Sequence, residues 1–185
     1  MSITIVLADD HPIVRQGLRA LLEKEPDFAV VGEAADGLEA VRLVERVHPD
    51  VIVLDLMMPG LGGLAALPIL RQRSPETRVV VLSMYSAADM VRQSFANGAT
   101  GYILKGSPPA RVLEAVRTAA AGRRFLCPGL EKALSQSAGH RWAETAQFAT
   151  VAAMKCEAGD PVSAIAGYRV AGQTLFHPVA DPIPE

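Results

Sequence analysis

Between residues 3 and 122 the chain alternates short apolar runs with longer segments of helical periodicity, and this alternation limits its fold more than any other feature. The runs are rich in Val, Ile and Leu, and most are continuous, which is typical of strands buried on both faces of a parallel sheet. They span residues 3–8, 28–34, 51–54, 79–83 and 101–104. Each run is followed by apolar residues three and four positions apart, which predicts an amphipathic helix.

Helix-ending residues follow the helical segments: Pro26, Pro49, Pro75, Gly98 and Gly122. Consecutive strand–helix units joined in this way predict an α/β domain with a doubly wound, flavodoxin-like parallel sheet of strand order 2-1-3-4-5. In such a sheet the working site lies at the carboxyl ends of the strands, near the switch point between the neighbouring first and third strands.

Three acidic side chains stand at this predicted edge. Asp9 and Asp10 end the first run and Asp55 ends the third, and these two strands are neighbours in the predicted order. Clustered carboxylates repel unless a cation compensates them, and Mg²⁺ suits a set of oxygen ligands that leaves room for a phosphate. Read singly, Asp9 and Asp10 before Pro12 also fit a helix cap, and Asp55 also fits an ordinary strand end.

Two hydrogen-bond donors stand at the ends of the last two strands: the fourth strand ends in Ser83 and the fifth in Lys105. Alone, the serine fits a turn and the lysine fits a solvated surface position. On the same edge as the carboxylates, a hydroxyl, an ammonium group and a Mg²⁺ ion would together hold the three oxygens of a transferring phosphoryl group.

These positions lie in segments that resemble the receiver domain of two-component response regulators. The matching segments are VLADDHPIVRQGL (6–18), VIVLDLMMPGLGGL (51–64), VVVLSMYS (79–86) and GATGYILKGS (98–107). Together with GRRFLCPGLEKAL (122–134), the first of them resembles the NarL/FixJ branch, which carries a helix-turn-helix output domain of the LuxR type. The resemblance covers residues 1 to about 122.

The resemblance implies a role for each residue at the acidic edge. Asp55 is the phosphoacceptor, Asp10 is a direct ligand of Mg²⁺, and Asp9 holds the ion through water. The backbone carbonyl of Met57 completes the protein ligands. His11 fits the pattern of the branch, but no role is assigned to it. An Asp-nucleophile phosphatase is less compatible, because Met57 stands where that chemistry needs a second acid.

The resemblance also implies a switch and its partners. Lys105 pairs with the phosphoryl oxygens, Ser83 moves to hydrogen-bond the phosphoryl group, and Tyr102 follows inward. The donor is a sensor histidine kinase, and the surface of the fourth helix, fifth strand and fifth helix forms a homodimer. Such a protein is a signalling protein that catalyses only its own phosphorylation and dephosphorylation, not an enzyme of metabolism.

The sequence predicts three parts: a receiver domain at 1–122, a linker at 123–137 and a tail at 138–185. The block that opens a helix-turn-helix in this branch is absent near residue 142, and Pro161 and Pro178 interrupt the helices it needs. A degenerate or truncated output domain, an unrelated appendage and a shifted reading frame all stay open.

Composition limits the remaining choices. The net charge of −2 offers no global basic surface for nucleic acid, so DNA binding stays an open partner assignment. Cys127 and Cys156 lack metal-ligand spacing, and neither a signal segment nor a membrane-length apolar run precedes or interrupts the domain. A cytoplasmic protein with no membrane contact is expected. Two functions compete: a transcriptional regulator, and a receiver that acts only by phosphotransfer or protein contacts.

Overall fold

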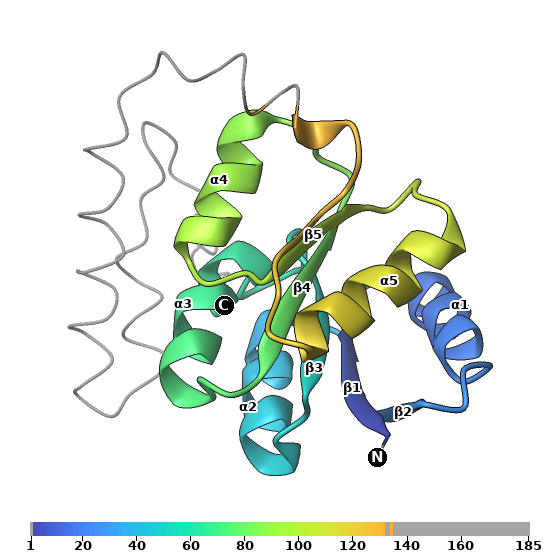
Figure 1. The fold of residues 1–185 in the computed structure, drawn as a ribbon. Helices are drawn as coiled ribbons and strands as arrows, with labels where there is room; N and C mark the ends of the chain where they lie inside the picture. The colour runs from blue at the N-terminus through green and yellow to red at the C-terminus, as the bar shows by residue number, and fades with distance from the viewer. Residues whose placement is uncertain (1, 132–133, 135–185) are drawn as a thin grey trace, which may run out of the picture. The chain divides into compact units, whose positions relative to one another are not determined.

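A computed structural model describes residues 2–131 and 134, so predictions about residues 135–185 lie outside the described residues. Strands and helices alternate in chain order (Figure 1). The elements are β1 (Ile3–Ala8), α1 (Pro12–Leu22), β2 (Phe28–Ala34), α2 (Gly37–Val47), β3 (Val51–Asp55), α3 (Gly63–Arg73), β4 (Arg78–Ser83), α4 (Ala88–Ala96), β5 (Gly101–Leu104), α5 (Pro109–Ala120) and β6 (Phe125–Leu126). None of the helices among the described residues is long and apolar enough to cross a membrane.

The strands form one parallel sheet of order β2-β1-β3-β4-β5-β6, which confirms the predicted flavodoxin-like order and extends it by one strand. Its register aligns the carboxyl ends of the central strands. Ala8 lies opposite Leu54, and Ser83 lies opposite Leu104. The residues that follow these strand ends are therefore brought to a common edge.

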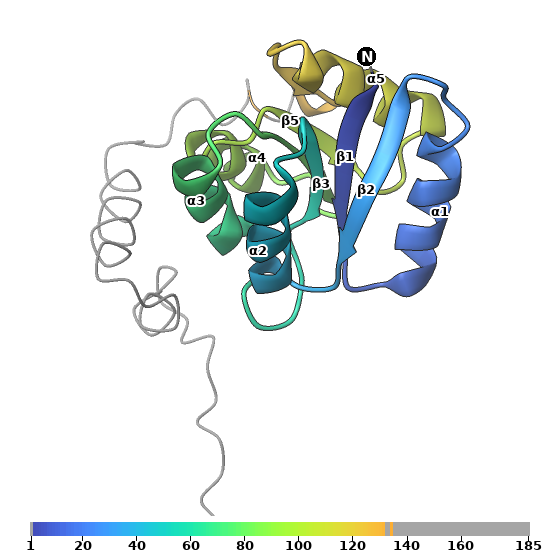
Figure 2. The same ribbon diagram turned by 90° about the horizontal axis from the view of Figure 1, so that it is seen from below.

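Helices cover both faces of the sheet, as the view from below shows (Figure 2). α1 and α5 lie on one face, and α2, α3 and α4 lie on the other. On the first face Leu18 and Leu22 of α1 and Val116 of α5 pack with Ile5 and Val53 of the sheet in one apolar cluster. Strands buried on both sides in this way explain why their sequences are continuously apolar.

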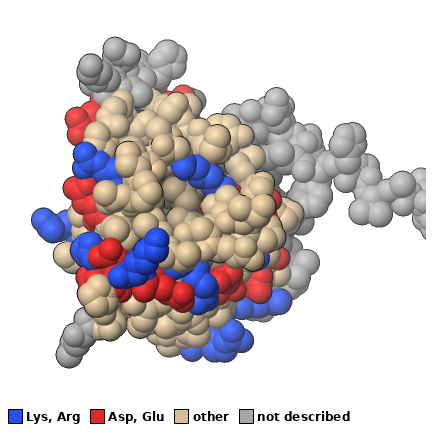
Figure 3. Space-filling model, turned by 90° about the vertical axis from the view of Figure 1, so that its right-hand side faces the viewer, with Lys and Arg blue, Asp and Glu red and all other residues tan. Residues whose placement is uncertain are grey.

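On one side of the domain, acidic and basic side chains are interleaved rather than separated by sign (Figure 3). Figure 3 shows acidic and basic side chains alternating across one side of the molecule. Within the described residues, Arg15 and Arg19 of α1 both pair with Glu33 of β2, and Arg117 of α5 pairs with Asp27. Such alternating pairs give this side no continuous basic surface of the kind that duplex DNA attracts.

Gly37, the first residue of α2, packs closely against the loop that follows β3. Its N–H donates a hydrogen bond to the carbonyl oxygen of Leu61 at 2.9 Å. A Cβ atom at this position would lie 2.2 Å from that oxygen, and the obstacle is backbone rather than a flexible side chain. This contact fixes the β3–α3 loop against the start of α2.

We therefore expect Gly37→Ala to lower the free energy of unfolding by about 2–3 kcal/mol, because the loop must shift to admit the methyl group. Gly17→Ala, in the exposed interior of α1 with no atom within 4 Å of the new Cβ, serves as the matched control. It should stabilise by about 0.5–1 kcal/mol through helix propensity. Urea unfolding of both variants measures the difference, and equal effects would contradict this account.

Candidate functional site

The ammonium group of Lys105 lies within ion-pair distance of two carboxylates of the acidic site. Its Nζ lies 2.8 Å from Oδ2 of Asp9 and 2.7 Å from Oδ2 of Asp55. Asp9 follows β1, Asp55 ends β3 and Lys105 follows β5, so the sheet order brings together side chains far apart in sequence. Both carboxylates are almost completely buried, with residue exposures of 1% and 3%.

Burial and charge act in opposite directions on these groups. Burial raises the pKa of Asp55, the hydrogen bond from Lys105 offsets this only in part, and the charge of Asp9 raises it further. Burial alone would lower the pKa of Lys105, but Asp55 and Asp9 outweigh it and the pKa is raised. The lysine therefore stays charged at neutral pH and acts as the fixed counter-ion of two buried carboxylates.

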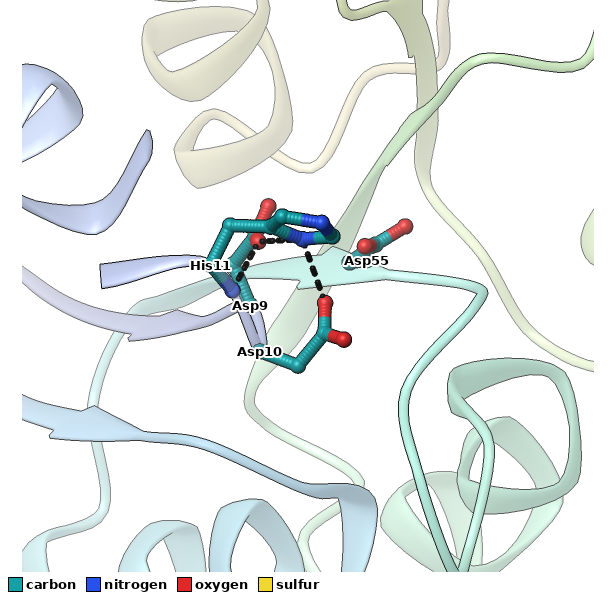
Figure 4. Close-up of side chains that lie close together, drawn as sticks. All are labelled: Asp9, Asp10, His11 and Asp55. Carbon is teal, nitrogen blue, oxygen red and sulfur yellow. Dashed lines mark hydrogen bonds and ion pairs between the residues drawn. The ribbon is translucent and has the colours of Figure 1, made fainter. Parts of the chain in front are cut away.

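A third carboxylate and an imidazole complete the cluster at its outer side (Figure 4). His11 Nδ1 lies 2.6 Å from Oδ1 of Asp10 and 3.3 Å from Oδ1 of Asp9. The backbone N–H of His11 also donates to Asp9 Oδ1 at 2.9 Å. One ligand atom from each of Asp9, Asp10, His11 and Asp55 can be chosen so that all lie within 4.8 Å of one another.

This donor set fits a hard divalent ion. Carboxylate oxygens predominate, and Mg²⁺ prefers such oxygens while keeping part of its water shell. Oδ2 of Asp9 and Oδ1 of Asp10 are buried and accept no hydrogen bond from the described residues, although the Lys105 ammonium lies 2.8 Å from the first and the His11 imidazole 2.6 Å from the second. Negative charge there is thus only partly compensated. The residues present fit the ion that the acidic cluster predicts.

Ser83 and Tyr102 meet through a residue that sequence reasoning did not single out, Tyr85. The N–H of Tyr85 donates to Ser83 Oγ at 3.1 Å, and the hydroxyl of Tyr102 donates to the carbonyl oxygen of Tyr85 at 2.7 Å. Ser83 and Tyr102 are fully buried, and burial raises the pKa of the Tyr102 phenol. The ring of Tyr102 is buried in this structure, and its movement on activation stays a prediction.

The structure thus brings together Asp9, Asp10, Asp55 and Lys105, and it joins Ser83 to them through the backbone. Ser83 O accepts a hydrogen bond from Lys105 N–H at 2.9 Å. Met57 donates its N–H to Asp55 Oδ1 at 3.2 Å, and the ligand role of its carbonyl stays a prediction. An aromatic residue in the loop after a central strand was the one available signal for Tyr85.

Because its folded pKa is raised, ionised Asp55 opposes folding at every pH above its unfolded pKa of about 4. We expect Asp55→Asn to remove this penalty and, in metal-free buffer at pH 7, to raise the free energy of unfolding by about 1 kcal/mol. The gain should vanish below about pH 4, where the wild-type carboxyl is neutral in both states.

The control is Asp50→Asn, since hydrogen bonds from Thr4 lower the pKa of Asp50. That variant should be destabilised at pH 7 and approach the wild type as the pH falls through the lowered pKa. Denaturant unfolding across the pH range tests both, and a destabilised Asp55→Asn variant at pH 7 would show that Lys105 outweighs burial.

Comparison with known proteins agrees with the geometry. The family model described as the response regulator receiver domain matches residues 5–117. The nitrate/nitrite response regulator protein NarL of Escherichia coli K12 is 42% identical over 134 residues, covering 72% of this chain and 62% of that protein. The transcriptional regulatory protein DegU of Brevibacillus brevis is 40% identical over 127 residues, covering 69% of this chain and 54% of DegU. The chain therefore spans little more than half the length of such relatives.

Solved structures give the same result. A LuxR-family two-component response regulator from Aurantimonas sp. SI85-9A1 superimposes with a TM-score of 0.71 at 40% identity, covering 74% of this chain and 97% of that one. The receiver domain of a response regulator NarL from Mycobacterium tuberculosis has a TM-score of 0.64 at 36% identity, covering 66% and 98%. The chain belongs to the response regulator receiver family, in its NarL-like branch.

Proposed function

We propose that Asp55 accepts a phosphoryl group and that the chain works as a two-component response regulator. The supporting observation is the buried pair of carboxylates, Asp9 and Asp55, held by one ammonium group at 2.8 and 2.7 Å. Asp55 attacks the phosphorus in line, so an O–P bond forms while the P–N bond of a kinase phosphohistidine breaks and its electron pair returns to the imidazole. The product is an acyl phosphate.

Asp9, Asp10, Asp55 and the Met57 carbonyl would hold Mg²⁺, which supplies positive charge between the attacking carboxylate and the incoming phosphate. The ammonium group of Lys105 has three N–H donors, so it can donate one hydrogen bond to a phosphoryl oxygen and still keep a carboxylate contact. The hydroxyl of Ser83 accepts the N–H of Tyr85, and its own proton, which hydrogen-bonds the Tyr102 phenol in this structure, can turn to the phosphoryl group.

Tyr85 links the reaction to a conformational equilibrium. Ser83 and Tyr102 both hydrogen-bond the backbone of Tyr85. The buried position of the Tyr102 ring and the arrangement of the loop after β4 therefore belong to one conformer. A phosphoryl group that bonds Ser83 has differential affinity for this conformer and shifts the population toward it. The group brings up to about two negative charges and three acceptor oxygens, ample for such a bias.

The wider role follows from the relatives, one of which is named a transcriptional regulatory protein. We infer a cytoplasmic regulator of transcription that is phosphorylated by a sensor histidine kinase and forms a homodimer on phosphorylation. A receiver that acts through protein contacts alone is the second candidate, favoured by the interleaved surface charges of Figure 3. Salt-dependent retention of the full chain on duplex DNA separates the two.

Acetyl phosphate with Mg²⁺ should add the mass of one phosphoryl group to the intact chain, and hydroxylamine should remove it, as expected of an acyl phosphate. Asp55→Ala should reduce labelling to background because the nucleophile is gone. Asp36→Asn is the control, since Asp36 caps α2 and an asparagine caps equally well. Labelling that persists in Asp55→Ala would refute the assignment.

Mg²⁺ at tenfold its dissociation constant should stabilise the wild type by about 1.4 kcal/mol, since only the folded chain assembles the site. Asp10→Asn should lose most of this gain, whereas Asp36→Asn should keep it. Thermal unfolding with and without Mg²⁺ measures the effect in the absence of any phosphodonor. An equal gain in all three proteins would mean that the ion binds elsewhere.

A further inference from the structure

The proposed function gives a role to three of the four residues drawn in Figure 4 and none to the fourth, His11. The figure shows the ring of His11 among the three carboxylates, with Nδ1 directed at Asp9 and Asp10. Nδ1 lies 2.6 Å from Oδ1 of Asp10 and 3.3 Å from Oδ1 of Asp9. Because histidine is the commonest metal ligand in proteins, this nitrogen is a candidate ligand of the ion.

Helix capping does not account for the orientation of the His11 side chain. His11 is the N-cap residue of α1, but its side chain makes no capping hydrogen bond. Ser, Thr, Asp and Asn are the usual residues at such a position, because their oxygen atoms accept a backbone N–H. The imidazole is also 64% exposed, so burial does not hold it in place. Its contacts among the described residues are with the carboxylates of Asp9 and Asp10.

The spacing of these atoms resembles that of neighbouring ligands on a single metal ion. With bonds of about 2.0–2.1 Å, adjacent ligands of an octahedral ion lie about 3 Å apart and opposite ligands about 4 Å apart. The two distances from Nδ1, 2.6 and 3.3 Å, lie on either side of the first value. One ligand atom from each of Asp9, Asp10, His11 and Asp55 fits within 4.8 Å. Small rotations of the side chains therefore place four ligands around one ion.

The carboxylates of this group have negative charge and oxygen atoms to offer an ion. Oδ2 of Asp9 and Oδ1 of Asp10 accept no hydrogen bond from the described residues, and the Asp9 side chain is only 2% exposed. Lys105 lies 2.8 Å from the first of these oxygens, but its ammonium is shared between Asp9 and Asp55. Three carboxylates beside one ammonium leave a net negative charge, which a divalent ion would neutralise.

A nitrogen ligand changes which ion such a group prefers. Mg²⁺ takes oxygen ligands and gives up its water reluctantly, whereas imidazole suits the first-row transition ions from Fe²⁺ to Zn²⁺. We propose that His11 binds the divalent ion through Nδ1 and raises the preference of this site for such a transition ion over Mg²⁺. This inference rests on the metal site of the proposed function, and it adds one ligand to that site.

The added ligand is compatible with phosphoryl transfer. The proposed function places Asp9, Asp10, Asp55 and the carbonyl of Met57 around the ion, and His11 would make five protein ligands. An octahedral ion then keeps one position for a phosphoryl oxygen, even if every carboxylate binds directly. The imidazole would take a position that water fills on Mg²⁺.

The test measures ion binding by the full chain without a phosphodonor, using isothermal titration calorimetry with Co²⁺ alone and with Mg²⁺ alone. His11→Ala should weaken Co²⁺ binding by about tenfold or more, since loss of even an outer partner of a metal ligand has that effect. Mg²⁺ binding should change by less than about twofold, because water replaces the imidazole around this ion. His11→Gln, which keeps a polar side chain without an imidazole, should show the same selective loss.

The matched control is His48→Asn. His48 is an exposed histidine at the end of α2 with a φ of 45°, and asparagine tolerates this left-handed conformation. The control should bind both ions as the wild type does. Bound Co²⁺ is paramagnetic, so it should broaden the amide NMR signals of Asp10 and Lys105 in the wild type. Broadening that spares these two amides would place the ion elsewhere and overturn the inference.

A purely electrostatic role for His11 predicts the opposite result. If the ring were only a charged partner of Asp9 and Asp10, its removal should strengthen the binding of both ions, because a competing cation is lost. Such strengthening, or equal Co²⁺ binding in His11→Ala and the wild type, overturns the inference. Thermal unfolding of the ion-free variants close to that of the wild type shows that they are folded.

The Mg²⁺ titrations separate this inference from the proposed function. Mg²⁺ binding that is present in the wild type and lost in Asp10→Asn, together with unchanged Co²⁺ binding in His11→Ala, overturns the role of His11 alone. The magnesium site of the proposed function would then stand. Absence of binding by either ion in the wild type overturns both.

Discussion

The domain depends on one ammonium group placed between two buried carboxylates from different strands. Asp9 and Asp55 are nearly inaccessible to water, and neither could be tolerated there as an isolated charge. Lys105 supplies the compensation at 2.8 and 2.7 Å, and it can do so only because the sheet order brings the ends of β1, β3 and β5 to one edge. The strand order thus determines which charged side chains lie next to one another at this site.

The same lysine connects charge to conformation. Its side chain balances Asp55, and its backbone N–H bonds the carbonyl of Ser83, whose hydroxyl in turn accepts the N–H of Tyr85. Tyr85 holds the buried Tyr102, and the carbonyl of Tyr102 holds Cys127. A change in charge at Asp55 therefore acts on a connected series of hydrogen-bonded residues that ends at Cys127, the residue after β6. Such continuity is a physical basis for coupling when the loop after β4 has two conformers.

Most of the fold could be predicted because strands buried on both faces have continuous apolar sequences. The predicted runs 3–8, 28–34 and 101–104 have the same bounds as β1, β2 and β5. The acidic cluster was predictable for a related reason, since strand order alone sends Asp9, Asp10 and Asp55 to one edge. β6 could not be predicted, because two residues carry no periodicity. Nor could Tyr85, whose role depends on backbone groups that every residue possesses.

The electrostatic balance at the site also explains why it suits a reversible nucleophile. Burial raises the pKa of Asp55 and makes its carboxylate a stronger base, while Lys105 limits the rise. A second carboxylate, Asp9, works against the ionised form and is only partly compensated. Folding therefore retains unfavourable charge at this edge, which a divalent ion relieves on binding. Functional sites commonly lower the stability of the fold in this way. If the charge of Asp55 were fully compensated, the carboxylate would gain little free energy by binding a cation and would be less reactive.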